Sequence, residues 1–406
     1  MAEAPVDSLN RERLCLEAQG RTVINLGQAV PDFGPPPVAV DAARRALEEP
    51  SVHVYSPDPG LPELRAAVAH SLERHFGWAT ARAAQTIVTG GANHAFLLIC
   101  STLLEQGDQV GLLSPFFLNH RMTVEGCGGT AVEIPPDASF SYPRETVERA
   151  IVEHGLVALV AVNPSNPTGK IFTSEELSGL LELSRKHGVW LIVDEVYRAF
   201  VPPSERMVSL GSLPAAEEGT LSFGSFSKEL GMTGWRVGWL HAPESLIPHL
   251  LKVQDYSLIC APRLGQRMAL ASIAESPEWT ASWLEELELR RRELTGRLDE
   301  SGLFQRFDSR GGYFVWLRPH RGVDSAREVL EIMRRAGVLI MPGAIFGEAW
   351  SSWFRISYGN QRRAALRRAA VRLIEYFASD RYAEPMNGHR EARPRAIASS
   401  TTTQGG

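Results

Sequence analysis

Apolar and polar positions follow helical spacing in the first part of the chain. Residues 1–20 are mostly polar and predict an arm with one short helix. After a break of three prolines, residues 35–50 carry apolar side chains at helical spacing, as in an amphipathic helix. Residues 61–76 predict another such helix, opened by Pro62 and Glu63.

From residue 86 onward, short apolar runs alternate with longer helical patterns. Alternation of this kind predicts βαβ units and a mostly parallel sheet flanked by helices, and thus an α/β fold. The predicted strands are 86–89, 109–113, 156–162 and 189–193, and the predicted helices include 94–104, 177–187 and 275–299.

The long helical pattern at 275–299 divides the chain into two predicted domains. We expect 41–285 to form a large domain and 286–379 a smaller α+β domain, which residues 1–40 join as an N-terminal arm. Residues 380–406 are poor in apolar side chains and are predicted to be a disordered, solvated tail.

Composition excludes several classes of function. The 406 residues are 44% hydrophobic and carry a net charge of −5, which argues against nucleic acid or an acidic membrane as the main partner. The N-terminal residues lack the features of a signal peptide, and no run reaches the length of a transmembrane helix. We therefore expect a cytoplasmic protein. The cysteines are Cys15, Cys100, Cys127 and Cys260. Because they lie far apart in the sequence, they predict neither a zinc site nor a disulfide framework.

A single lysine, Lys228, lies in the segment with the clearest chemical character. Its flanks, residues 220–226 and 234–240, read as buried strands, and an unpaired buried ammonium is costly. Covalent attachment to an aldehyde cofactor through a Schiff base would remove that cost and make the amine a nucleophile and proton carrier. Ser225, Ser227 and Arg236 would then bind an anion, most simply a phosphate. A buried strand pair with a surface lysine is the alternative.

Polar side chains also follow two other predicted strands. Asn166 comes after one apolar run, and Asp194 and Tyr197 come after the next. The carboxyl ends of parallel strands share one edge of a sheet, where ligands of open α/β proteins bind. We therefore expect these residues to lie near Lys228.

Three motifs together resemble the class I/II aminotransferases, pyridoxal phosphate (PLP) enzymes of fold type I. They are N-P-S-N-P-T-G at 163–169, D-E-V-Y at 194–197 and S-F-S-K-E-L-G-M-T-G-W-R-V-G at 225–238. The segment I-N-L-G-Q-A-V-P-D-F-G-P-P-P at 24–37 resembles the branch of kynurenine and glutamine transaminases and cysteine-conjugate lyases. The resemblance extends over about residues 20–378 and implies a large PLP-binding domain, with a sheet of about seven strands, and a smaller domain.

The resemblance implies how the cofactor ring is held. Asp194 would keep the pyridine nitrogen protonated, so that the ring accepts electrons, and Lys228 would carry the cofactor. Tyr197 and Asn166 would donate hydrogen bonds to its phenolic oxygen, and Phe117 would stack on the ring, with Phe116 as the competing choice. Alternative roles are capping of a turn for Asp194 and turn formation for Asn166.

The resemblance also implies a phosphate site shared between two subunits. A strand, a glycine turn and a helix at 88–96 offer the backbone amides of Ala92 and Asn93, beside Ser225 and Arg236. Tyr55 would reach the phosphate of the neighbouring subunit in a homodimer, or else simply pack within its loop. The P-loop pattern is absent from the sequence.

Arg355 is the candidate for binding the substrate carboxylate. It lies in the otherwise apolar segment W-F-R-I-S-Y, and a guanidinium in mid-strand needs an anion. A structural salt bridge is the alternative.

Two positions depart from the family pattern. Ala29 stands where a glycine is usual near the substrate carboxylate, and His120 stands where many relatives carry tyrosine. We consider both as substrate-site residues; His120 could be an acid or base, or a packing residue. Residues 253–263 include Asp255, Tyr256, Ile259 and Cys260 but show no clear arginine clamp for a dicarboxylate.

The resemblance implies transfer of an amino group from an L-amino acid to a 2-oxo acid, with ping-pong kinetics. A neutral, aromatic or sulfur-bearing donor is favoured over a dicarboxylic one. The alternatives are a PLP-dependent C–S β-lyase, a decarboxylating or oxidative deaminase, and, more remotely, a non-enzymatic PLP-binding regulatory domain.

Overall fold

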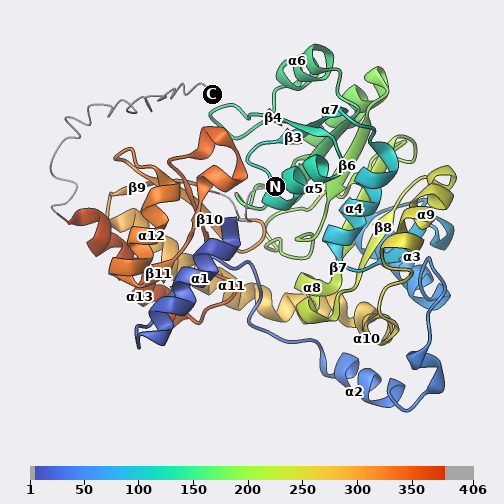
Figure 1. The fold of residues 1–406 in the computed structure, drawn as a ribbon, viewed down its shortest axis with the longest axis horizontal. Helices are drawn as coiled ribbons and strands as arrows, with labels where there is room; N and C mark the ends of the chain where they lie inside the picture. Colours follow the sequence, from blue (N-terminus) through green and yellow to red (C-terminus); the bar gives the residue numbers. More distant parts are fainter. Residues whose placement is uncertain (1–4, 309, 380–406) are drawn as a thin grey trace, which may run out of the picture.

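The computed structural model describes residues 5–308 and 310–379 and contains a central seven-stranded sheet (Figure 1). One strand, β8, is antiparallel to both neighbours, and the other pairs are parallel. The predicted α/β fold with a mostly parallel sheet is confirmed. In spatial order the strands are β2 (Thr86–Thr89), β8 (Gly238–His241), β7 (Thr220–Ser225), β6 (Trp190–Asp194), β5 (Ala158–Val162), β3 (Gln109–Leu113) and β4 (Thr130–Ile134).

Helices cover both faces of this sheet. In β6, Ile192 packs into the apolar cluster on one face, whereas Leu191 and Val193 pack into the cluster on the other. Both faces of a parallel strand are buried in this way, which explains its uninterrupted apolar run. One face is covered by α4 (Ala92–Leu103), α5 (Leu118–Gly126) and α9 (Ile247–Ser257), and the other by α6 (Arg144–His154) and α7 (Ser174–His187).

A further group of helices packs at the β2 edge. Leu64 of α3 and Met268 of α10 share an apolar cluster with Trp239 of β8. The predicted helices at 35–50 and 61–76 are both present. The helices are α2 (Pro37–Ala46), α3 (Pro62–Phe76) and α10 (Arg263–Ser272).

A smaller antiparallel sheet lies apart from the first, in orange in Figure 1. Its strands, in order, are β12 (Met341–Pro342), β13 (Phe354–Ser357), β10 (Phe314–Pro319) and β9 (Phe304–Phe307). The short β1 (Ile24–Asn25) pairs with β11 (Val338–Leu339) beside it. Its helices are α1 (Pro5–Ala18), α12 (Ser325–Ala336) and α13 (Arg363–Ala378), and the long α11 (Ser276–Glu300) leads to it.

The division at residues 40, 285 and 379 remains a prediction. The proposed tail, 380–406, lies outside the described residues.

The predicted strand at 234–240 is wrong in its first half. Residues Thr233–Trp235 form a 3-10 turn, Arg236 has a left-handed backbone with φ 52°, and β8 begins only at Gly238. This turn lets the exposed Arg236 guanidinium donate to the carbonyl oxygens of Thr233 at 3.0 Å and Gly90 at 3.2 Å.

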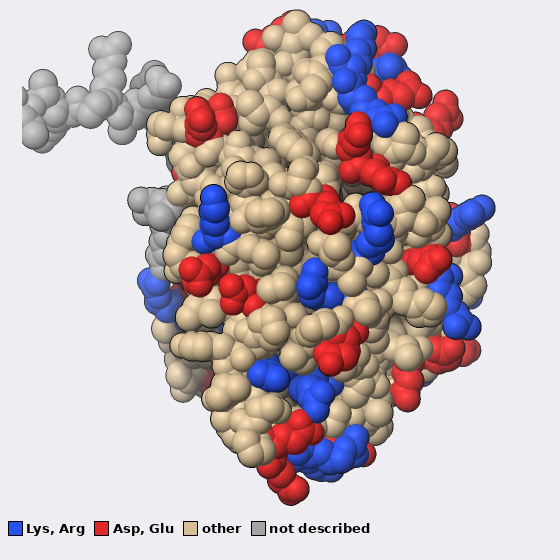
Figure 2. Space-filling model, turned by 90° about the vertical axis from the view of Figure 1, so that its right-hand side faces the viewer, with Lys and Arg blue, Asp and Glu red and all other residues tan. Residues whose placement is uncertain are grey.

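The surface carries charges of both signs. Figure 2 shows Lys and Arg interspersed with Asp and Glu on one face, with no large area of a single sign. Within residues 5–308 and 310–379, no helix is long and apolar enough to cross a membrane.

Candidate active site

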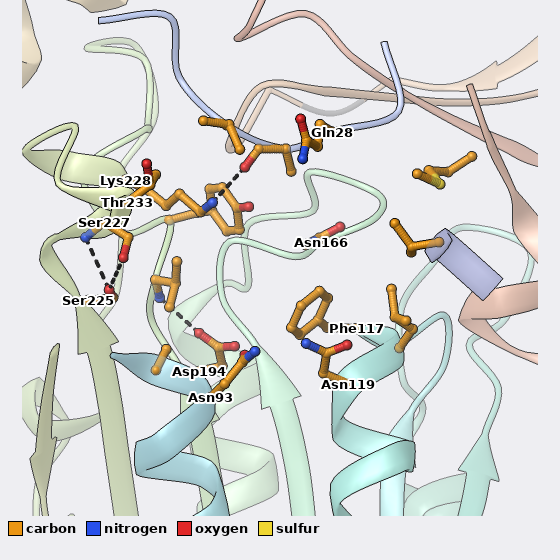
Figure 3. Close-up of a pocket in the computed structure, with 18 of the residues that line it drawn as sticks. Gln28, Asn93, Phe117, Asn119, Asn166, Asp194, Ser225, Ser227, Lys228 and Thr233 are labelled. Atoms are coloured by element: carbon orange, nitrogen blue, oxygen red, sulfur yellow. Dashed lines mark hydrogen bonds between the residues drawn. The ribbon is translucent and has the colours of Figure 1, made fainter. Parts of the chain in front are cut away.

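A cavity of about 440 Å³ opens at the carboxyl ends of β5, β6 and β7 (Figure 3). It contains all the candidate site residues except Tyr55 and His120. Those that line it are Ala29, Ala92, Asn93, Phe117, Asn166, Asp194, Tyr197, Ser225, Ser227, Lys228, Arg236 and Arg355.

Lys228 projects into the cavity from the short helix α8 (Phe226–Glu229), which directly follows β7. Its Nζ donates a hydrogen bond to the Ala29 carbonyl oxygen at 2.6 Å (Figure 3). Burial, reinforced by the positive charges of Arg355 and Arg236, lowers the pKa of Lys228 to about 8. The amine is therefore much closer to its neutral, nucleophilic form than an exposed lysine at neutral pH.

Arg355 lies buried in the middle of β13 with a 4% exposed side chain. Nη1 donates to Asn166 Oδ1 at 2.8 Å, and Nη2 donates to the Gly27 carbonyl oxygen. Burial lowers its pKa to about 10. No acidic residue within the described chain pairs with it, so the alternative of a structural salt bridge finds no partner there.

Asp194 ends β6 and presents its carboxylate to the cavity floor. Oδ1 accepts a hydrogen bond from the Val196 amide at 2.9 Å, and Oδ2 lies 3.3 Å from Nε2 of His120. His120 is 2% exposed, contacts the ring of Phe96 and does not line the cavity. The structure thus brings His120 to the carboxylate rather than to the space for a substrate.

Tyr197 lines the cavity, and the backbone of Ala29 contacts the amine of Lys228. Burial raises the pKa of Tyr197 well above its usual range, which keeps the phenol protonated as a hydrogen-bond donor. The carbonyl oxygen of Ala29 accepts from Tyr313 at 3.3 Å as well as from Lys228, so the backbone of this loop is held against the cavity.

Hydrogen-bond donors converge at the start of α4. Gly91 precedes this helix with φ 93°, and no side chain caps the helix, so the amides of Ala92 and Asn93 have no acceptor within it. Arg236 lies so close that a β-carbon on Gly91 would stand 2.6 Å from its Nη2. These groups suit a dianion, and a phosphate fits them by chemistry and by space.

Hydroxyl groups complete this donor set. Ser225 Oγ donates to Ser227 Oγ at 2.8 Å (Figure 3). Arg236 Nη1 lies 3.5 Å from the same Ser227 oxygen. With the Asp194 carboxylate and the Lys228 amine in the same cavity, the residues fit a phosphorylated aldehyde that carries a basic ring nitrogen.

Comparisons with known proteins agree with this chemistry. The family described as "Aminotransferase class I and II" matches residues 21–373. The chain belongs to this family. It is similar to an aromatic-amino-acid aminotransferase of Thermococcus litoralis, with 32% identity over 347 residues that cover 84% of this chain and 88% of that protein. An aspartate aminotransferase of Pyrococcus abyssi is 31% identical over 353 residues, which cover 86% of this chain and 90% of that protein.

Solved structures show the same fold. A double mutant of Thermus thermophilus aspartate aminotransferase has a TM-score of 0.86 and 30% identity, and the match covers 92% of this chain and 97% of that chain. The protein is thus an enzyme, an aminotransferase, and members of its family use pyridoxal 5'-phosphate with amino acid and keto acid substrates. The narrower resemblance to kynurenine and glutamine transaminases stays a prediction.

Phe117, not Phe116, lines the cavity of this aminotransferase. Phe116 is 2% exposed and packs beneath the Arg121 guanidinium, which lies 4.9 Å from the ring centre. The spacing within S-P-F-F therefore places the second aromatic ring where a cofactor could stack.

Tyr55 lies outside the cavity and is 74% exposed. Tyr256 is equally exposed, and neither it nor Asp255, Ile259 or Cys260 lines the cavity. These residues lie outside the cavity of their own chain.

Sequence reasoning missed several residues that line the cavity. Gln28 adjoins Ala29, and Thr233 lies inside the lysine motif, so both carried a local signal. No local sequence signal marked Val6 and Asp7, because their position at the cavity depends on how α1 packs against α12. The other residues missed are Gly27, Val30, Leu118, Asn119, Val196 and Met341.

Proposed function

We propose that this aminotransferase takes its amino group from a neutral L-amino acid, aromatic or sulfur-bearing rather than dicarboxylic, and transfers it to a 2-oxo acid. The observation that carries the proposal is the set of positive charges around the cavity. Within the described chain, only Lys228, Arg236 and Arg355 supply them. Each has a partner in the cofactor or in the substrate's α-carboxylate, so none is left for a second carboxylate.

When bound, pyridoxal phosphate supplies a protonated pyridine ring that accepts the electron pair left at the substrate Cα. In our proposal Asp194 holds the ring nitrogen, Phe117 covers one face of the ring, and Tyr197 and Asn166 donate to its phenolic oxygen. The amides of Ala92 and Asn93, with Ser225 and Arg236, bind the phosphate.

Lys228 is proposed to bind the cofactor aldehyde and, once released by the incoming amino group, to move the proton at Cα. Its lowered pKa suits this work, because an amine that titrates near pH 8 can both accept and return a proton. Arg355 binds the α-carboxylate and thereby directs Cα toward the Lys228 nitrogen.

The test is a reaction without a keto acid acceptor. Purified holoenzyme is mixed with a panel of amino acids that includes S-substituted cysteines, and keto acid, ammonia, thiol and carbon dioxide are assayed. One equivalent of keto acid per site, with conversion of the cofactor to its amine form, is the expected result. Many turnovers with release of thiol, ammonia or carbon dioxide would instead establish the lyase or deaminase alternative.

We further propose a homodimer in which Tyr55 reaches the phosphate of the partner's site. The support is the exposure of Tyr55 outside its own cavity, together with the contact of its loop with β2, where the Val88 amide donates to the Pro59 carbonyl oxygen at 2.9 Å. A cytoplasmic location remains a prediction from the sequence.

A further inference from the structure

The first turn of α1 forms part of the cavity mouth. Leu9 and Leu16 anchor the helix in the core of the smaller sheet, each with 5% exposure. Glu12 accepts from Arg334 of α12 at 2.6 Å, and Figure 1 shows α1, in dark blue, alongside α12. With the helix fixed in this way, Val6 and Asp7 reach the cavity.

The residues near this turn are mainly apolar. Val6 shares the cavity lining with Leu118, Val30 and Met341, which form an apolar wall suited to the carbon chain of a substrate. Gln28 and Asn119 also line the cavity and are uncharged (Figure 3).

Asp7 is the one charged residue of the lining that the proposed function does not use. The described lining contains two acidic residues, Asp194 and Asp7. Asp194 is assigned to the cofactor ring. Asp7 is exposed, lies in the first turn of α1 and lines the same cavity as Lys228 and Arg355.

We propose that Asp7 selects the charge of the substrate side chain. A side chain with an apolar stem and a cationic or N–H-donating end is accepted, and one that ends in a carboxylate is rejected. An exposed carboxylate changes the binding of a nearby unit charge about threefold, so the preference for a cationic over an anionic end changes about tenfold. The inference rests on the proposed function, because that function assigns the other charges of the cavity, and it extends the proposed donors from neutral to cationic side chains.

A structural role of Asp7 is the competing explanation. An acidic residue in the first turn of a helix stabilises that helix through its dipole. The variant Asp7→Asn keeps an oxygen acceptor of the same shape and removes only the charge. Glu17→Gln removes one charge from the same helix about 15 Å further along its axis and serves as the matched control.

Binding is measured first, with carboxylic acids that cannot react. Hexanoate, adipate and 6-guanidinohexanoate lack an α-amino group and differ at the far end in being neutral, anionic or cationic. Calorimetric titration of the pyridoxal phosphate-loaded enzyme should give the tightest binding for the guanidinium compound and the weakest for adipate. In Asp7→Asn the ratio of these two dissociation constants should fall about tenfold, and in Glu17→Gln it should stay unchanged.

The half-reaction then compares lysine, norleucine and 2-aminoadipate, which share a six-carbon chain. Lysine and norleucine should exceed 2-aminoadipate in kcat/KM, and Asp7→Asn should narrow the gap between lysine and 2-aminoadipate by the same factor. If the reaction proceeds but the ratios do not change, or if adipate binds the unaltered enzyme as tightly as hexanoate, the role of Asp7 is wrong. If no amino acid reacts while the binding order holds, the proposed function fails and the charge selection by Asp7 stands.

Discussion

At the scale of single residues, Arg355 is the clearest case of a charge that needs a ligand. It lies over the rings of Phe314 and Phe346, with its guanidinium carbon 5.3 Å and 5.1 Å from their centres, and it bonds only neutral oxygens. A buried cation with neutral partners lowers its free energy by binding an anion.

Arg355→Lys should therefore weaken amino acid binding while the cofactor stays bound. Lysine keeps the positive charge but lacks the planar guanidinium that can donate two parallel hydrogen bonds to a carboxylate. Loss of about 2 kcal/mol of charged hydrogen bonding should lower kcat/KM roughly 30-fold or more. Steady-state kinetics with the best donor, together with the cofactor absorbance, measures this. An unchanged KM with reduced cofactor loading would contradict the carboxylate role.

Lys228 predicts a pH dependence for uptake of the cofactor. The amine is cationic below its pKa and nucleophilic above it, so capture of pyridoxal phosphate by the apoenzyme should accelerate as pH rises and level off above about 8. At pH 6 the rate should be about a hundredfold below the plateau, because two pH units separate it from the pKa.

Stopped-flow absorbance between pH 6 and 10 measures that rate. A peptide lysine, with an ordinary pKa of about 10.4, is the control. A midpoint near that value in the enzyme would show that burial and the neighbouring arginines do not act on the amine as described.

His120 is expected to position Asp194 rather than to meet the substrate. His120→Phe keeps a ring in the aromatic pocket but removes the contact at 3.3 Å with Oδ2. The affinity for pyridoxal phosphate should fall about tenfold, and His120→Gln should recover part of it. Equilibrium titration of the apoenzyme gives the affinity, and ratios of kcat/KM between amino acids should stay constant. A change confined to those ratios would support a substrate role instead.

At the scale of elements, the phosphate site depends on the turn between β2 and α4. Gly91 combines φ 93° with ψ 174°, a backbone conformation that is essentially restricted to glycine. The free amides of the helix start and the Arg236 side chain meet at this point.

Gly91→Ala should lower both stability and cofactor affinity. Backbone strain of about 1–3 kcal/mol should reduce the melting temperature by several degrees. Displacement of Arg236 should weaken pyridoxal phosphate binding at least about tenfold. Gly107→Ala is the matched control, because Gly107 has φ 90° but no neighbour within 4 Å. Gly107→Ala should lower the melting temperature without changing the affinity for the cofactor. An equal loss of cofactor affinity in both variants would show that displacement of Arg236 is not its cause.

At the scale of the whole molecule, apolar side chains are exposed near the phosphate end of the cavity. Leu258 lies against Gly90, and Arg263 donates to the carbonyl oxygen of Tyr55 at 3.0 Å, which brings these loops together. Exposed apolar groups that gather in this way indicate an interface. They are Val54, Tyr55, Trp235, Tyr256 and Leu258.

We expect a solution mass of twice 44.7 kDa and active sites shared between subunits. A mixed dimer of one Lys228→Ala chain and one Tyr55→Ala chain should then contain one fully native site. Differently tagged chains, co-expressed and purified as the mixed species, should bind one cofactor with native affinity per dimer. If Tyr55 serves its own chain, no site in the mixed dimer is native and no such binding is seen.

Local periodicity was sufficient to predict most elements, because helical and strand spacing are properties of neighbouring residues. Helices at 35–50, 61–76 and 275–299 and the parallel strands all occur. The strand predicted at 234–240 begins late because Arg236 takes a left-handed turn, and its side chain donates to the carbonyl oxygen of Gly90, which is distant in sequence.

Some residues of the site could likewise be predicted from the local sequence, whereas others are shown only by the folded structure. Lys228, Asp194, Asn166 and Ser225 follow strands or motifs that can be recognised from adjacent residues, and parallel strands bring them to one edge. Only the folded chain shows that His120 lies under Asp194 and that Asp7 reaches the cavity mouth. These contacts join segments far apart in the chain, and their geometry depends on packing between elements, which no local pattern of residues encodes.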